Sequence, residues 1–187
     1  MNNEYSEGPL EQFRRWYEEA GTDVVALATA TVEGAPSARM VLLKGADERG
    51  FTFFTNYESR KGRELADNPR AALLFHWPGR QVRIEGSVEQ VSEKESDAYW
   101  ATRPRGAQLA ASTSKQSAPI ASREELERRL AALDAATEVE VPRPAHWGGY
   151  RLLPESYEFW THRDDRMHDR LSFRREGEGW KTERLSP

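Results

Sequence analysis

The chain has 187 residues, with 27 lysines and arginines, 31 aspartates and glutamates, and no cysteine. This length suits one domain with a substantial core, and the balanced charge lacks the basic excess of a nucleic-acid-binding protein. Its mean hydropathy is −0.83, and no apolar run reaches the roughly 18 residues of a membrane span, which predicts no membrane segment. The absence of cysteine excludes disulfides and thiolate chemistry, and together with a polar N-terminus it favours a cytoplasmic protein.

Helices are predicted where apolar side chains recur at helical spacing behind a capping residue. The first helix covers residues 9–20 and is followed by Gly21, a residue type that commonly ends helices. Ser59, Ser92 and Ser122 are suited to cap three more helices, and a glutamate three residues after each of the last two completes a capping box. These helices are predicted at residues 60–67, 92–100 and 122–136, with a short helix inside the loop 106–118.

Strands are predicted where β-branched and aromatic residues alternate with polar ones between turn residues. They cover residues 24–32, 37–44, 51–55, 71–77, 81–91, 149–153, 157–161, 170–175 and 180–184. Short strands with inserted helices indicate a mainly β domain with peripheral helices, closed as an antiparallel barrel, with a β-sandwich as the alternative. We expect a single domain over residues 1–187, in which residues 1–12 form a flexible N-terminal segment.

Residues 166–170, with the sequence Arg-Met-His-Asp-Arg, are the first candidate for a functional site. If they form a strand, Arg166, His168 and Arg170 project from one face, and Trp160 lies close by in the sequence. Two guanidinium groups and an imidazole on one face suit an anionic, planar ligand. The alternative interpretation is a solvated, charged strand.

Arg60 and Lys61 lie in the first turn of a predicted helix, directly after the capping residue Ser59. Basic side chains at a helix N-terminus oppose the helix dipole, and a bound anion such as a phosphate resolves that conflict. The alternative is a solvated start of the helix.

Further polar residues are spaced for ligand contacts. Tyr99 and Arg103 are four residues apart on one predicted helix, so they face the same way and together could hold an oxyanion. Arg39 and Lys44 are five residues apart on one strand, so we expect them on opposite faces, where they make different contacts or one of them is simply exposed.

In their order along the chain, these and other segments resemble the pyridoxine (pyridoxamine) 5′-phosphate oxidase family, flavin enzymes of vitamin B6 metabolism. The resemblance extends from Phe13 to the C-terminus. Its motifs are residues 39–44, 53–56, 59–61, 80–82, 114–117, 147–149, 158–160, 166–170 and 183–187.

The resemblance implies an antiparallel split β-barrel homodimer that binds FMN at the subunit interface and needs no metal. The implied activity is oxidation of pyridoxamine or pyridoxine 5′-phosphate to pyridoxal 5′-phosphate with O2, releasing H2O2. The implied FMN-binding residues are Arg39, Met40, Val41, Leu42, Leu43, Lys44, Phe54, Thr55, Arg60, Lys61, Gln81, Gln116, Ser117, Trp160 and Arg170. The implied substrate-binding residues are Lys44, Tyr99, Arg103, Arg166 and His168, of which Arg166 and His168 are implied to be catalytic.

Three departures from the family pattern leave the substrate open. Ala107 stands where the family usually has a serine, the loop 77–80 is shorter than in the family pattern, and the N-terminal segment is short, with Tyr5 as an unassigned candidate. One alternative is a related flavin oxidase of the phenazine-pathway type that acts on another small cyclic substrate. The other is a split-barrel protein that binds FMN or pyridoxal phosphate without turnover.

Overall fold

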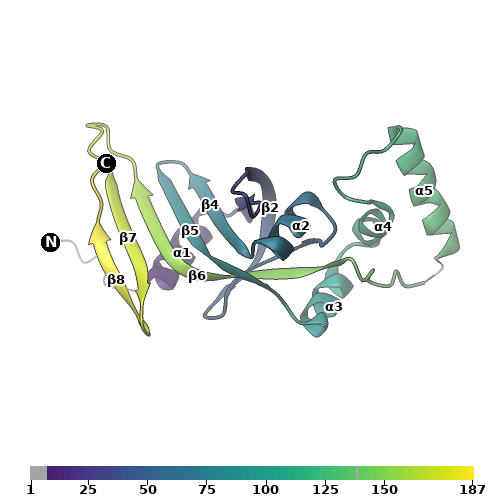
Figure 1. Cartoon of the computed structure of the whole chain (residues 1–187), viewed down its shortest axis with the longest axis horizontal. Helices are drawn as coiled ribbons and strands as arrows, with labels where there is room; N and C mark the ends of the chain where they lie inside the picture. The colour runs from purple at the N-terminus through teal and green to yellow at the C-terminus, as the bar shows by residue number, and fades with distance from the viewer. Residues whose placement is uncertain (1–7, 138) are drawn as a thin grey trace.

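A computed structural model describes residues 8–137 and 139–187, whose strands form one antiparallel sheet (Figure 1). The helices are α1 (Pro9–Ala20), α2 (Arg60–Asp67), α3 (Glu93–Thr102), α4 (Arg105–Thr113) and α5 (Arg123–Ala136). The strands are β1 (Val24–Ala30), β2 (Pro36–Asp47), β3 (Gly50–Asn56), β4 (Arg70–Trp77), β5 (Arg80–Gln90), β6 (Trp147–Thr161), β7 (Asp169–Glu176) and β8 (Gly179–Arg184). The predicted helices and most predicted strands are confirmed.

The sheet closes into a barrel because β3 pairs with β6 as well as with β2. The strand order is β3-β2-β1-β4-β5-β6, and β7 and β8 extend the sheet beyond the closure. Along one edge of β6, the first part pairs with β3 (Trp147 to Leu152) and the last part pairs with β7 (Ser156 to Thr161). The predicted closed antiparallel barrel is therefore confirmed, and the sandwich alternative is wrong.

Strand β6 corrects one prediction, because the two strands expected at residues 149–153 and 157–161 are a single strand. Pro154 lies inside it, at a bulge where Gly86 is paired with Pro154 and Glu85 with Ser156. A bulge tolerates a residue that has no N–H to donate, so the proline does not end the strand.

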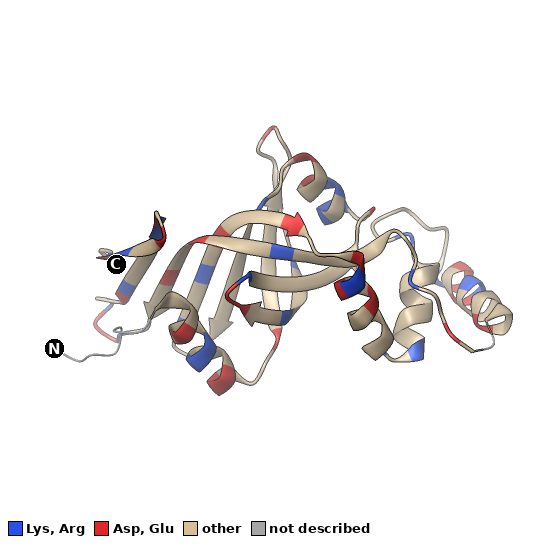
Figure 2. Ribbon diagram, turned by 90° about the horizontal axis from the view of Figure 1, so that it is seen from below, with Lys and Arg blue, Asp and Glu red and all other residues tan. Residues whose placement is uncertain are grey.

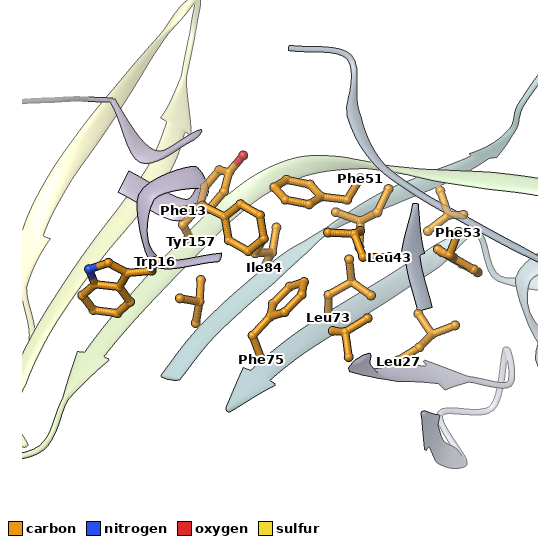
Figure 3. Packing of buried hydrophobic residues seen from close by; sticks show 14 of the residues in the cluster. Phe13, Trp16, Leu27, Leu43, Phe51, Phe53, Leu73, Phe75, Ile84 and Tyr157 are labelled. Atoms are coloured by element: carbon orange, nitrogen blue, oxygen red, sulfur yellow. The ribbon is translucent and has the colours of Figure 1, made fainter. Parts of the chain in front are cut away.

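The core fills the barrel with side chains from the strands and from α1 (Figure 3). Phe13 of α1 is fully buried, and its ring centroid lies 4.9 Å from those of Phe51 and Phe75. Pro9 and Gln12 are also buried in α1, so residues 9–12 belong to this helix rather than to a flexible segment. Tyr5 lies outside the described residues.

Helices α3, α4 and α5 lie at the opposite end of the molecule from β7 and β8 (Figure 1). They surround a second cluster of buried residues formed by Trp100, Leu109, Val141 and Trp147. The capping box at the start of α3 is present, with both reciprocal contacts between Ser92 and Glu95.

Acidic and basic residues are interspersed over the strands and helices (Figure 2). Within the described ranges, no helix is long and apolar enough to span a membrane.

Candidate active site

A cavity of about 420 Å³ lies between the barrel and the helical end of the molecule. Its lining comes from β2, β3, the start of α2, the end of α3, the start of α4, the loop after α4 and the start of β6. The lining residues are Met40, Val41, Leu42, Lys44, Phe54, Thr55, Lys61, Tyr99, Thr102, Arg103, Pro104, Ala107, Gln116 and Trp147.

This cavity gathers much of the site predicted from the sequence. The predicted FMN-binding residues that line it are Met40, Val41, Leu42, Lys44, Phe54, Thr55, Lys61 and Gln116, and the predicted substrate-binding residues are Lys44, Tyr99 and Arg103. A second cavity of about 390 Å³ shares Arg103 and Ala107 with the first and continues along α4 to Ala111 and Ser114.

Lys61 is a buried cation, only 8% exposed, in the first turn of α2. Its ammonium group donates to three neutral oxygen atoms: Thr55 Oγ1 at 2.9 Å, Gln116 Oε1 at 2.8 Å and Ser59 Oγ at 3.2 Å. Burial and the nearby Arg39 lower the pKa of Lys61 to about 8. The three acceptors are neutral, and Glu64, which acts on Lys61 only at a distance, is paired with Arg39 and Arg60, so Lys61 favours an anion at this end of the cavity.

The neighbouring arginines are instead held by Glu64, which is 5% exposed. This carboxylate accepts hydrogen bonds from Arg60 Nε at 2.8 Å and Arg39 Nη2 at 3.2 Å, and also from Ser37 and Thr29. Burial alone would raise the pKa of Glu64, but these hydrogen bonds lower it to about 2. Glu64 was not predicted as a site residue, although it follows Arg60 by four residues and therefore lies on the same face of α2.

Lys44 lines the cavity, whereas Arg39 contacts Glu64, so the prediction that these two strand residues make different contacts is confirmed. Lys44 forms an ion pair with Asp23, which the sequence analysis also missed. Leu43, predicted to contact FMN, is only 2% exposed and belongs to the barrel core.

Arg103 makes no ion pair with a carboxylate in the described part of the chain. Its Nη2 donates to the carbonyl oxygen of Ala107 at 3.0 Å, and its guanidinium carbon lies 4.6 Å from the centroid of the Trp147 ring. Burial lowers the pKa of this guanidinium. Beside it, Tyr99 stacks on Phe54 with ring centroids 4.0 Å apart. This end of the cavity therefore offers a second uncompensated positive charge next to an aromatic wall.

The condition for a common face of Arg166, His168 and Arg170 is not met, because residues 166–168 are not in a strand: β7 begins at Asp169, close to the start predicted at residue 170. Arg166 lies in a turn with φ of 61°, and Asp165 Oδ1 accepts the N–H of Met167 at 2.9 Å, which stabilises that turn. The ring of His168 instead lies 4.7 Å from the ring of Trp160.

Three predicted FMN-binding residues form a row across the sheet at this end of β6. Gln81 is paired with Trp160, and Trp160 with Arg170, so the three side chains share one face. Arg170 Nε donates to Glu158, which is buried, at 2.8 Å. Neither this row nor the loop with Arg166 and His168 lines the cavity, so one chain carries the predicted site as two separate groups.

Ser117 and Arg60 lie beside the cavity rather than in its lining. Ser117 has φ of 70°, and its Oγ accepts the backbone N–H of Arg60 at 3.1 Å, which places the loop after α4 against the start of α2. Among the described residues, no cluster of three or more histidine, aspartate or glutamate side chains could hold a metal ion.

Two family models match the chain. The model described as pyridoxamine 5′-phosphate oxidase matches residues 10–135, and the model described as pyridoxine 5′-phosphate oxidase C-terminal dimerisation region matches residues 147–187. The pyridoxine/pyridoxamine 5′-phosphate oxidase of Rubrobacter xylanophilus is 58% identical, covering 96% of this chain and 87% of that protein. The enzyme of the same name from Cupriavidus pinatubonensis is 55% identical, covering 96% and 89%.

Solved structures show the same fold. PhzG from Burkholderia lata 383, in complex with tetrahydrophenazine-1-carboxylic acid, has a TM-score of 0.94 at 36% identity, covering 100% of this chain and 97% of that one. A pyridoxamine 5′-phosphate oxidase-related, FMN-binding protein from Nostoc punctiforme has a TM-score of 0.73 at 18% identity, covering 94% and 93%.

Proposed function

The chain belongs to the pyridoxamine 5′-phosphate oxidase family of oxidoreductases, and we propose that it uses FMN to oxidise pyridoxamine or pyridoxine 5′-phosphate to pyridoxal 5′-phosphate. One observation carries the proposal: Lys61 and Arg103, two cations without a carboxylate partner among the described residues, line the same cavity. Two phosphate groups match them, that of FMN at Lys61 and that of the substrate at Arg103.

The residues around Lys61 fit the phosphate end of FMN. Lys61, Thr55 and Gln116 already form a hydrogen-bonded group at the start of α2, where the positive end of the helix dipole favours an anion. The stretch from Met40 to Leu42 and the ring of Phe54 would bind the flatter, less polar part of the cofactor. When bound, FMN would supply the acceptor for a hydride from the carbon that bears the amine or alcohol, and O2 would reoxidise it to give H2O2.

The missing part of the site would come from a second copy of the chain. Met40 is 61% exposed, Leu42 47%, Val24 42% and Leu74 37%, and they lie on the adjacent strands β2, β1 and β4. This apolar face is continuous with the cavity, because Met40 and Leu42 line both. Burying the face in a homodimer would remove it from water. Residues 147–187, which match the dimerisation region, include Trp160 and the Arg166–His168 loop.

We assign the chemistry near the substrate ring to Arg166 and His168 of the partner copy. The N–H of Arg163 donates to His168 Nδ1 at 3.1 Å, so Nε2 carries the proton of the neutral ring and can donate a hydrogen bond to the reacting group. Arg166 would orient the ring and stabilise negative charge that develops on it.

A second candidate is a related flavin oxidase that acts on another cyclic acid. Ala107 favours it, because an alanine side chain offers no hydroxyl to a phosphate and opens onto the second cavity. The structural likeness to PhzG points the same way.

The test is O2 consumption by the FMN-reconstituted protein with pyridoxine 5′-phosphate, pyridoxamine 5′-phosphate, unphosphorylated pyridoxine and tetrahydrophenazine-1-carboxylic acid, the compound bound to PhzG. We expect the phosphorylated vitamers to have the highest kcat/KM, and Arg103→Ala to lower it by about 10- to 150-fold, the loss of a hydrogen bond to a charged group. Ala107→Ser should maintain or raise kcat/KM for the phosphorylated vitamers. An Arg103→Ala enzyme that oxidises the phosphorylated vitamers as well as wild type would instead favour the second candidate.

A further inference from the structure

We infer that Trp147 is a positioning residue for Arg103 and thereby sets the preference of the site for phosphorylated substrates. The inference rests on the proposed function, in which Arg103 binds the phosphate of the substrate. Trp147 itself was predicted only as part of a family motif, without a role.

Arg103 is held differently from the other cations around the cavity, of which Lys61 is held by neutral side-chain oxygen atoms and the rest by carboxylates. Lys44 pairs with Asp23, and Arg39 and Arg60 pair with Glu64, so a carboxylate fixes each of these cations and also offsets its charge. Arg103 is held by the face of Trp147 at 4.6 Å and by the Ala107 carbonyl oxygen at 3.0 Å, with the Trp100 ring farther away at 5.3 Å. An aromatic face and a carbonyl oxygen fix a guanidinium while leaving its full charge for a ligand.

The Trp147 ring is itself firmly fixed, which a positioning role requires. It is 4% exposed, lies nearly parallel to the rings of Phe54 (14° at 5.6 Å) and Tyr99 (9° at 6.2 Å), and meets the edge of Trp100 at 4.8 Å. Its backbone is held by pairing with Asn56 at the start of β6.

Arg103 depends on such a support because of its place in the chain. It caps the C-terminal end of α3, directly before Pro104, so no further turn of α3 restrains its side chain, and α4 holds it only through the Ala107 carbonyl oxygen. Without the ring, the guanidinium keeps one hydrogen bond, to Ala107, and a longer contact with the Trp100 ring at 5.3 Å, so it is held less tightly toward the cavity. Loss of the ring should therefore weaken binding of a phosphate that Arg103 contacts, beyond any general effect on the site.

The experiment compares Trp147→Leu, Trp147→Phe, Arg103→Ala and Leu109→Ala in the FMN-loaded protein. Leu109→Ala is the matched control, because Leu109 is buried in the same cluster and lies outside the cavity lining. The readouts are the ratio of kcat/KM for pyridoxine 5′-phosphate to that for pyridoxine, and the dissociation constant of pyridoxal 5′-phosphate by calorimetry. General damage to the site lowers both kcat/KM values and leaves their ratio unchanged.

We expect Trp147→Leu to lower the ratio and weaken pyridoxal 5′-phosphate by about 3- to 30-fold, the range of a partly buried cation–π contact. Trp147→Phe keeps a weaker aromatic face, so it should lower the kcat/KM ratio and the affinity for pyridoxal 5′-phosphate by about two- to threefold. In a double variant that also carries Arg103→Ala, Trp147→Phe should have no further effect. Leu109→Ala should keep the wild-type ratio.

The inference would be overturned if every Trp147 variant that folds keeps the wild-type ratio of kcat/KM values while Arg103→Ala lowers it. If Trp147→Leu does not fold, Trp147→Phe still provides the test, because it preserves the aromatic packing. A lowered ratio in Leu109→Ala would also overturn it, because the effect would then follow from core damage. If Arg103→Ala itself keeps the wild-type ratio, the proposed role of Arg103 fails instead.

Discussion

Lys61 shows how a single buried charge prepares the site for its ligand. Removing its ammonium group from water costs free energy, and three neutral oxygen acceptors recover only part of that cost, which is why its pKa is about 8. A phosphate dianion would restore the missing stabilisation. The residue is thus a source of instability in the free protein and a source of affinity in the complex.

The first prediction is that stability and FMN affinity change in opposite directions as pH rises, because both depend on the protonation of Lys61. The unfolded chain keeps the lysine proton up to its ordinary pKa of 10.5, so between about pH 8 and 10.5 the unfolded state binds more protons than the folded state. The stability of the FMN-free protein should therefore gain from this residue as pH rises through that window, by up to about 3 kcal/mol. Denaturant titrations of wild type and Lys61→Met at pH 7.5 and 9.5 measure the difference.

FMN affinity should show the opposite trend, because the phosphate binds the protonated lysine. Above pH 8 the affinity should fall by as much as tenfold per pH unit in wild type. Lys61→Met should be weaker by about 1.5–3 kcal/mol at pH 7 and nearly independent of pH above 8. Flavin fluorescence quenching measures the dissociation constants, and equal pH slopes in the two proteins would contradict the role assigned to Lys61.

Strand β6 connects the two groups of predicted site residues. Trp147 at its start faces the cavity, and Trp160 near its end lies in the row with Gln81 and Arg170. The bulge opposite Gly86 lies between these two parts, where β6 leaves its pairing with β3 and begins its pairing with β7. The bulge therefore allows β6 both to close the barrel through β3 and to pair with β7, which extends the sheet beyond the barrel.

The second prediction concerns that bulge. A Cβ added to Gly86 would lie 1.9 Å from the carbonyl oxygen of Leu153, a backbone atom of β6 that cannot move freely. Gly86→Ala should destabilise the protein by about 1–3 kcal/mol, the usual cost of overpacking. Gly45→Ala is the control, because Gly45 also lies at a strand irregularity but its added Cβ meets Thr52 only at 3.6 Å. Similar thermal midpoints for the two variants would show that the strands accommodate the methyl group at Gly86.

The third prediction concerns the loop between β6 and β7. Arg166→Ala and His168→Ala should retain FMN, because both residues are proposed to contact the substrate rather than the cofactor, yet each should slow flavin reduction by pyridoxine 5′-phosphate by about 10²-fold or more. Anaerobic stopped-flow absorbance at saturating substrate measures this step directly. Wild-type reduction rates in both variants would remove these residues from the chemistry.

Local patterns predicted most of the elements, because caps, turns and alternation act over a few residues, as at Ser59 and Ser92. Some of what they did not reveal depends on contacts far apart in the sequence. Pro154 suggested a break that the bulge opposite Gly86 absorbs, and the ion pairs of Asp23 with Lys44 and of Glu64 with Arg39 join residues more than 20 positions apart. The turn at Arg166 and the pair of Glu64 with Arg60 are local, and there the alternation of Arg166, His168 and Arg170 and the focus on cations gave the wrong emphasis.

The division of the site into two groups leads to the last prediction, a complementation test between chains. If the cavity of one copy receives the Arg166–His168 loop of its partner, a heterodimer of Arg103→Ala and Arg166→Ala chains contains one intact site and one doubly altered site. Differently tagged chains, co-expressed and purified through both tags, should therefore have about half the wild-type activity per dimer, although each homodimer is nearly inactive. The control heterodimer pairs Arg103→Ala with Lys44→Ala, two changes in the same cavity, and should stay nearly inactive because each of its sites carries one of them. No recovery in the first heterodimer would mean that each chain builds its site alone, and the apolar face around Met40 would then need another explanation.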